Sequence, residues 1–218
     1  MAIARDSGPT SASATSTTLT FAFTNTAGDG LIVGVTGDTV ADDVTGVTWG
    51  GVAMTLVDKI QVPSNRYIYL FYKTNAATGT ANIVVTASTS HLLIGFAESY
   101  SGTNTTEMKD ASGKNTSTAS ATLAVSATVV ASDCWLAGFF NTTADNGMTA
   151  GTGTSLLGAP SDRNLADSNG AVSTGAQTLN IDVSGGTLNN AGVIMSIAPA
   201  AGAAVVTRRR DLTLLAAG

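Results

Sequence analysis

The chain has 218 residues, and threonine, alanine, glycine and serine together make up about half of them. Charged residues account for 11% of the chain, against roughly 25% in an average globular domain. Because only 2 glutamates and 4 lysines are present, the sequence lacks the residues that normally cover the exposed faces of surface helices. One histidine and one cysteine exclude a His-rich or Cys-rich metal site and a disulfide framework.

Charge and hydropathy also limit the partners. The net charge is −5, whereas domains that bind nucleic acid are usually basic, so we expect no nucleic-acid partner. The first residues, Met1 to Pro9, lack the apolar core of a secretory signal, and no apolar run approaches the roughly 18 residues of a membrane span. We therefore expect no membrane partner. The mean hydropathy of +0.24 leaves two interpretations open, a surface of uncharged Thr and Ser strands or a surface covered by neighbours in an assembly.

Most of the first half alternates with the period of two that is typical of β-strands. Residues 18–24 place Leu19, Phe21 and Phe23 on one face of such a strand. A turn at Asp29-Gly30 leads into the next apolar run. Two further strands flank Gly50-Gly51, a pair that predicts a tight two-residue hairpin.

The strand after this hairpin is apolar on both faces. Residues 66–73 place Tyr67, Tyr69 and Phe71 on one side and Ile68, Leu70 and Tyr72 on the other, so we expect a central strand covered on both sides. An aromatic row at strand spacing is more often core than a sugar-binding platform. Residues 82–87 and 91–99 predict two more strands, and the polar stretch 102–120 predicts a long connection.

The later strands complete an all-β pattern. We expect them at residues 121–130, 134–140, 177–183 and 192–198, separated by a loop-rich region. No segment has the helical period, so the predicted fold is a jelly-roll-like antiparallel β-sandwich of about ten strands. The expected organisation is an N-terminal arm at 1–16, the sandwich at 17–199 and a C-terminal arm at 200–218.

A weak internal repeat accompanies these strands. Residues 31–35 align with residues 135–139 when the chain is shifted by about 104 positions. Two such halves could interleave into one jelly roll, or they could form two small sandwiches in series. We expect one domain, because a half of roughly 90 residues has a thin core and no linker separates the halves.

The sequence offers no catalytic set. Nucleophilic catalysis needs a base near a Ser or Cys, and His91, the single histidine, starts an apolar strand where a structural role is expected. Cys134 lies beside another apolar strand and is expected to be a buried hydrophobic residue. The two glutamates, Glu98 and Glu107, are expected not to form a glycosidase pair, and Glu98 has the opposite strand parity to His91. We therefore predict that the protein is not an enzyme.

Metal and cofactor signals are also weak. The run that begins at Asp162 breaks the alternating oxygen pattern of a calcium loop, and the run from Asp167 to Gly170 is too short to supply a full set of ligands. The pair Asp42-Asp43 sits in a turn context, where Asp bonds to its own backbone. No Gly-rich phosphate loop occurs, so we expect no metal and no cofactor.

The last segment is the most unusual one. Three of the ten basic residues are adjacent after the last strand, in an otherwise acidic chain, and leucines follow them. One interpretation is a solvated tail. The other is an arm that docks on the sandwich or on a neighbour, where guanidinium groups would pair with carboxylates. The candidate partner-binding residues are Arg208, Arg209, Arg210, Leu212, Leu214 and Leu215.

Several motifs resemble those of a known group of proteins. The run from Val47 to Val57, with Trp49-Gly50-Gly51 at its turn, resembles a hairpin that recurs in jelly-roll proteins of bacteriophage virions. The later runs Tyr69 to Tyr72, Ala77 to Val85 and Ser99 to Gly102 follow in the same order. The resemblance covers roughly residues 17–199 and carries over no catalytic residue. The Trp49 position is often Tyr in these relatives, and Gly50 is often Asn, both of which suit a hairpin.

This resemblance implies a virion structural protein, made in a host cytoplasm and located in the virion. The predicted role is capsid decoration, in which a cement protein stabilises the head through subunit contacts. The implied partners are copies of the chain itself, for which a trimer is a common arrangement, and a major capsid protein or other virion protein. The alternative is a tail or fibre module that binds host surface glycans. A glycan-active enzyme is a third reading, and it lacks a carboxylate pair or a base.

Overall fold

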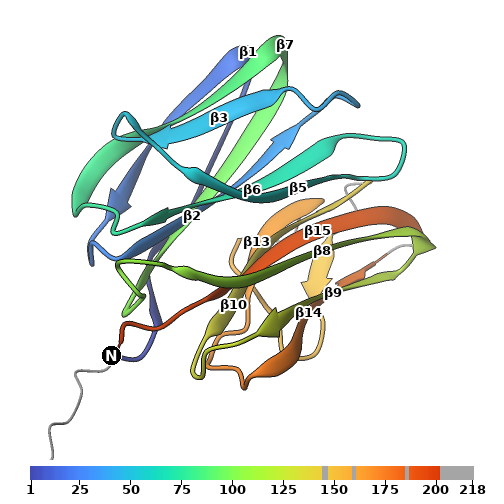
Figure 1. Cartoon of the computed structure of the whole chain (residues 1–218). Coiled ribbons are helices and arrows are strands. Elements are labelled where there is room, and N and C mark those ends of the chain that lie inside the picture. Colours follow the sequence, from blue (N-terminus) through green and yellow to red (C-terminus); the bar gives the residue numbers. More distant parts are fainter. Residues whose placement is uncertain (144–146, 159–160, 185–186, 202–218) are drawn as a thin grey trace, which may run out of the picture.

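The computed structural model describes residues 1–143, 147–158, 161–184 and 187–201, and these residues form fifteen β-strands and no helix (Figure 1). The strands form three sheets in which paired neighbours run antiparallel. The all-β class expected from the period-two alternation is therefore confirmed. The expected count of about ten strands is too low, because several polar segments without an apolar period also pair into the sheets.

The first seven strands form one strongly curved sheet. They are β1 (Ala4–Asn25), β2 (Gly30–Gly37), β3 (Val44–Trp49), β4 (Val52–Ala53), β5 (Thr55–Gln61), β6 (Tyr67–Thr74) and β7 (Gly79–Ser101). The order is β4-β3-β7-β2-β6-β5, and β1 pairs along the other edge of β7. On its inner edge, β7 pairs first with β3 through residues 83–87 and then with β2 through residues 93–100. The sheet therefore divides into two facing layers where β7 bends, at residues 88–90.

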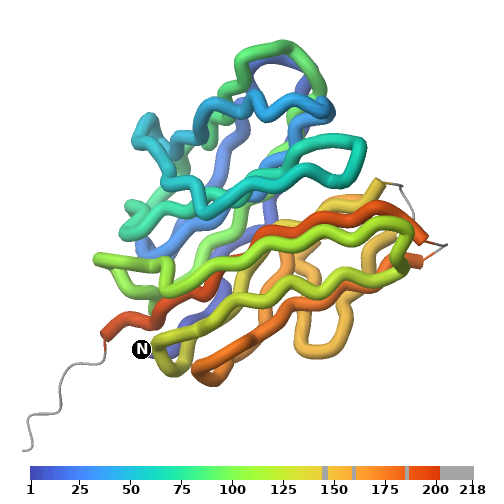
Figure 2. The backbone as a smooth tube through the Cα atoms, turned by 45° about the vertical axis from the view of Figure 1, so that its right-hand side comes forward, coloured from blue at the N-terminus to red at the C-terminus, as the bar shows by residue number. Residues whose placement is uncertain are grey.

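The second half contains two smaller sheets. Its strands are β8 (Lys109–Ser120), β9 (Thr122–Val129), β10 (Trp135–Thr142), β11 (Met148–Ala150), β12 (Ser155–Leu156), β13 (Arg163–Asp167), β14 (Gly175–Val183) and β15 (Leu188–Ile197). One sheet has the order β12-β13-β10-β15-β8, and the other has the order β11-β14-β9. Figure 2 shows this half stacked against the first, with the two halves following each other along the chain.

The second half repeats the strand pairing of the first. β9 and β8 pair with β14 and β15 as the two parts of β1 pair with the two parts of β7, and β10 lies between β15 and β13 as β2 lies between β7 and β6. Within the described ranges, strands of one half pair only with strands of the same half. Of the two arrangements left open by the sequence, the strand pairing is therefore that of two small sandwiches in series and not that of interleaved halves.

A capping carboxylate confirms the repeat at atomic detail. Asp6 accepts hydrogen bonds from the backbone N–H groups of Thr26 (2.9 Å) and Ala27 (3.0 Å) in the turn after β1, and from the hydroxyl of Ser99 (2.8 Å). Asp110, 104 positions later, makes the same three bonds. Its partners are the backbone amides of Val130 and Ala131 and the hydroxyl of Ser196. Each half thus closes its first turn against its last strand in the same way.

The register of the repeat differs by one residue from the sequence alignment in β10. Leu31 and Leu136 each face the core of their own half, which is a shift of 105 rather than 104. Phe139, aligned with Val35 by the shift of 104, instead faces the layer between the halves. One extra residue in the turn before β10 accounts for the difference, because a shift of one position turns a strand over.

Three hydrophobic clusters hold the layers together. The first fills the interior of the first half and includes Phe21, Trp49 and Phe71. The second lies between the halves, where residues of β2, β6 and β7 pack against β10, β13 and β15. The third lies between the two sheets of the second half. Burial of these apolar faces is the main stabilising contribution, and the middle cluster makes the two halves one packed unit.

Two predicted segments differ in the structure. Residues 1–16 were assigned to an arm, but β1 begins at Ala4 and pairs with β7 from there. The stretch 102–120 was assigned to a connection, but residues 109–120 form β8 and pair with β15. Both segments are rich in Ser, Thr and Ala and lie at sheet edges, where backbone pairing needs no continuous apolar face.

Other local predictions are confirmed. Gly50 and Gly51 form the turn between β3 and β4 with φ of 57° and 78°, the positive values that a tight hairpin of this type requires. β6 lies between β2 and β5 and is buried on both faces, so its aromatic row belongs to the core. Leu19, Phe21 and Phe23 share the buried face of β1.

Candidate functional site

The predicted partner-binding arm begins beside a cavity. The six candidate residues, Arg208, Arg209, Arg210, Leu212, Leu214 and Leu215, lie outside the described residues. The described chain is held up to this point by an N–H of Ala200 that donates to the carbonyl of Gly102 (2.8 Å). A cavity of about 640 Å³ is lined there by residues that include Met1, Ile3, Trp135 and Ala201. The arm therefore starts next to a partly apolar hollow that also receives the N-terminus.

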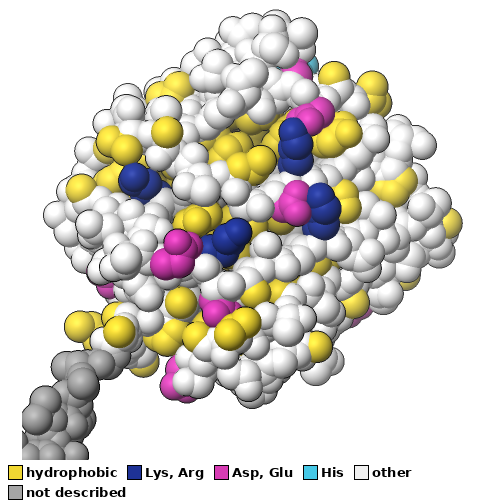
Figure 3. Space-filling model, in the orientation of Figure 1, with side chains coloured by type: hydrophobic (Ala, Val, Ile, Leu, Met, Phe, Trp, Pro, Cys, Tyr) yellow, Lys and Arg dark blue, Asp and Glu magenta, His cyan; other side chains and the backbone are white. Residues whose placement is uncertain are grey.

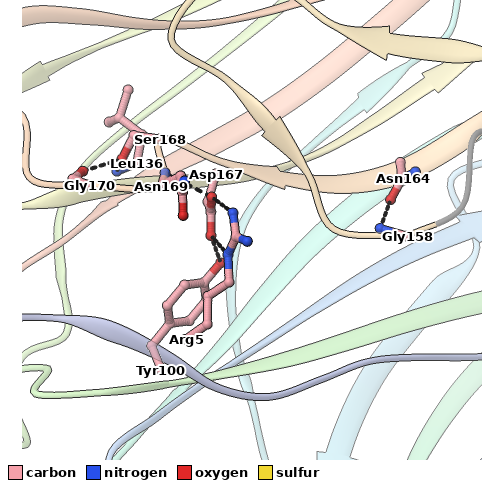
Figure 4. A network of polar contacts seen from close by, with 9 residues as sticks. All are labelled: Arg5, Tyr100, Leu136, Gly158, Asn164, Asp167, Ser168, Asn169 and Gly170. Carbon is pink, nitrogen blue, oxygen red and sulfur yellow. Dashed lines mark hydrogen bonds and ion pairs between the residues drawn. The ribbon is translucent and has the colours of Figure 1, made fainter.

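A partly buried ion pair joins the two halves (Figure 4). Arg5, at the start of β1, donates from Nε (2.7 Å) and Nη2 (2.5 Å) to the two carboxylate oxygens of Asp167, at the end of β13. The Tyr100 hydroxyl (3.1 Å) and the N–H of Asn169 (2.9 Å) also donate to this carboxylate, which is fully buried. The hydrogen bond to Asp167 raises the pKa of Arg5, and burial raises the pKa of Tyr100 well above its ordinary value. The two-pronged geometry suits a structural tie between layers.

Glu98 lies next to this ion pair and is almost completely buried. It shares a face of β7 with Phe96 and Tyr100, toward the layer between the halves. Burial raises its pKa to about 8, although the positive charge of Arg5 opposes that shift. Its Oε2 has no hydrogen-bond partner in the described part of the chain. The raised pKa favours the protonated form of Glu98 at neutral pH, beside the Arg5–Asp167 pair.

His91 forms a separate polar contact. Its Nδ1 lies 3.1 Å from Oδ2 of Asp43, and the same oxygen accepts a hydrogen bond from the Thr89 hydroxyl (2.6 Å). The His91 ring packs against Gly37, where a Cβ would lie 2.8 Å from Nε2. His91 and Asp43 are largely buried, so they tie the bend of β7 to the loop before β3. Leu93 and Ala97, which lie on the same face of β7 as His91, point into the core of the first half. Glu98 lies on the opposite face, so the prediction that His91 and Glu98 do not share a strand face is confirmed.

The other singled-out residues lie apart from one another. Glu107 is in the loop before β8, where its Oε1 accepts a hydrogen bond from the Tyr72 hydroxyl (3.4 Å), and it does not join Glu98. Cys134 is buried, and burial raises the pKa of its thiol to about 11, which makes it a poor nucleophile. Asp162 pairs with Arg66 (3.3 Å) and Arg163 (2.7 Å). None of these contacts brings a nucleophile, a base and an acid together.

Surface charges occur mainly as pairs. Figure 3 shows basic and acidic side chains side by side in a band across one face, with uncharged surface around them. The ion pair between Lys114 of β8 and Asp58 of β5 (2.8 Å) links the two halves at their edges, and Lys59 pairs with Asp42 nearby. Exposed pairs of this kind contribute little to stability.

The Arg5–Asp167 tie is the feature that sequence reasoning missed. These residues lie 162 positions apart, and Arg5 belongs to a segment that was assigned to an arm. The sequence did carry one signal. Asp6, the neighbour of Arg5, is equivalent to Asp110 in the repeat, which indicates that this segment belongs to the folded first half. No group of three potential metal-ligating His, Cys, Asp or Glu side chains occurs in the part of the chain that the structure describes. Over the same residues, no helix is long and apolar enough to cross a membrane.

Comparisons with protein-family models, with curated proteins and with solved structures returned no match to this chain.

Proposed function

We propose that the chain is a structural protein of a bacteriophage virion, and that it decorates the capsid and stabilises the head through subunit contacts. The observation that carries the proposal is the use of four ionisable groups in the described chain, of which Asp167 is fully buried. Arg5, Asp167, Asp6 and Asp110 all bind other parts of the framework. A protein built in this way supplies shape and surface rather than chemistry.

The strand order supports the jelly-roll part of the proposal. When the eight strands of the second half, β8 to β15, are numbered one to eight in chain order, one sheet contains the order first, eighth, third and sixth. The other sheet has the order second, seventh and fourth. This order is the one that an eight-stranded jelly roll adopts, and viral capsid domains use that fold. The resemblance of residues 47–57 to a virion-protein hairpin is consistent with it, although fold alone carries no function.

The surface supports an assembly role. Exposed residues on β1, β8 and β9 are mainly Thr, Ser and Ala, which can pack against copies of the chain or a major capsid protein without desolvating charge. Many weak contacts of this kind give tight attachment when they act together on one particle. The C-terminal arm adds a basic anchor that leaves the fold beside the terminal cavity.

The test is addition of the purified protein to capsids that lack it. DNA-filled particles that lack the protein are prepared from a phage that encodes this chain by deleting its gene, and their heat resistance is followed by release of packaged DNA. Saturable binding with a higher release temperature is the expected result. Capsids that neither bind the protein nor gain heat resistance contradict the decoration role. Strong binding on a glycan array without capsid binding would instead support a tail or fibre module.

A further inference from the structure

The outer edge of β1 is the longest unpartnered strand edge in the described structure. β1 has 22 residues and pairs with β7 alone. In β7, the carbonyls of Asn82 and Leu92 accept hydrogen bonds from the side on which β3 and β2 lie. Because the backbone groups of successive residues point to opposite sides of a strand, the odd-numbered residues between them form their hydrogen bonds with β1. Their partners in β1 include Leu19 and Phe21.

The alternation of an antiparallel pair then fixes the outward groups. The N–H and C=O of Thr18, Thr20, Ala22 and Thr24 point away from β7. One of these groups has a local partner, because the N–H of Thr18 donates to the hydroxyl of Ser16 (3.1 Å). The described residues supply no other hydrogen bond to this part of the edge.

The corresponding edge of the second half is closed. The equivalent positions in β9, 104 residues later, are 122, 124 and 126. Asn115 of β8 donates to the carbonyl of Ala124 (2.9 Å), and the Ser117 hydroxyl donates to the carbonyl of Thr122 (3.1 Å). A Cβ at Gly113 would overlap the carbonyl oxygen of Ser126, so only glycine lets β8 approach so closely. One copy of the repeat therefore covers this edge within the chain, and the other copy leaves it open.

The composition of the open edge suits pairing with itself. No charged residue occurs between Asp6 and Asp29, so two copies of the strand would meet without charge repulsion. The other edge strands are short, like β4 and β12, or carry charges, like β5 and β8. Proteins usually protect long neutral edges, because such edges recruit further strands.

We propose that β1 pairs antiparallel with β1 of a second copy of this chain, about a two-fold axis that crosses the strand. An isologous contact of this kind satisfies the open edges of both copies at once. It extends the sheet of the first half across the dimer and leaves the second halves on the outside. The inference is independent of the proposed virion role.

A matched pair of double variants tests the proposal. Thr18→Lys with Ala22→Lys places two charges on the edge, whereas Thr86→Lys with Asn82→Lys places them on the residues directly opposite in β7, one strand inward. All four side chains are exposed in the described structure. Sedimentation equilibrium of the full chain should show a dimer that the edge variant weakens by more than about tenfold, while the inward variant changes it by less than about twofold. Circular dichroism and thermal unfolding check that both variants fold.

A cysteine scan along β1 tests the geometry directly. Single Cys substitutions at Thr18, Thr20, Ala22 and Thr24 are oxidised, and cross-linked dimer is measured. Disulfides form only near the axis, because residues two positions from it lie about 13 Å from their own copies. A sharp maximum at one position or two neighbouring positions supports the proposal. A monomer up to about 100 µM, equal loss of dimer in both Lys variants, or a dimer without cross-linking in β1 would each overturn it.

Discussion

Replacing Glu98 with Gln isolates the protonated acid buried between the two halves. The raised pKa of about 8 favours the neutral form of this acid at pH 7, and Gln has nearly the same size and no charge. The substitution therefore keeps the packing against Phe96 and Tyr100 and removes the titration. Any difference in pH dependence between the two proteins then reports on Glu98 itself.

The magnitude follows from the two pKa values. Burial raises the pKa of Glu98 from its ordinary 4.5 to about 8 in the fold. An acid whose folded-state pKa is raised contributes stability that is fully present below the unfolded pKa and is lost as pH rises through the folded pKa. One pKa unit corresponds to about 1.36 kcal/mol, so the natural chain should lose several kcal/mol of stability between about pH 4.5 and pH 8 through this group.

The assay is urea unfolding of both proteins at a series of pH values from 5 to 9. The Gln variant should match the natural chain near pH 5 and become more stable than it by several kcal/mol near pH 8.5. All other ionisable groups are present in both proteins, so the difference between the two stability curves reports on Glu98 and its interactions with them. Parallel stability curves would show that Glu98 is ionised or solvated in the fold and would refute the reasoning.

Three further outcomes are expected. Asp167→Asn leaves Arg5 without its charged partner and should lower the free energy of unfolding by about 2 kcal/mol, measured in urea. Gly113→Ala places a Cβ against the carbonyl of Ser126 and should destabilise the protein by about 2 kcal/mol or more, whereas Gly46→Ala, with open space around it, should change stability by less than about 1 kcal/mol. Removing residues 202–218 should leave thermal unfolding nearly unchanged and weaken capsid attachment, and replacing Arg208, Arg209 and Arg210 with Ala should weaken attachment and its salt dependence. Attachment that survives the deletion would show that the arm is a passive end.

The strands that sequence predicted well carry regular rows of buried apolar side chains, on one face in residues 18–24 and on both faces in residues 66–73. Residues 18–24 and 66–73 carry large apolar side chains at regular spacing, and burial of those side chains sets both the strand and its orientation. The Gly50-Gly51 hairpin was equally readable, because its backbone needs positive φ at two successive positions. Local chemistry determines these elements, so a single sequence is sufficient to find them.

The segments that sequence missed depend on distant partners. β8 is polar along its length, and it forms a strand because β15 supplies a ladder on one side and β9 approaches it on the other. The first part of β1 is Ser- and Ala-rich and is held by β7. The register of β10 depended on one extra residue in a turn, which a weak repeat could not locate. The Arg5–Asp167 tie joins residues that only the packed halves bring together.

Immuno-electron microscopy of purified phage particles tests the central claim most directly. The proposed virion role requires particles of a phage that encodes this chain, and the antibody is raised against the purified protein. The account predicts label distributed over the outer surface of the head, which is lost when the gene is deleted. Particles without label, or label confined to the tail, would contradict a role in capsid decoration.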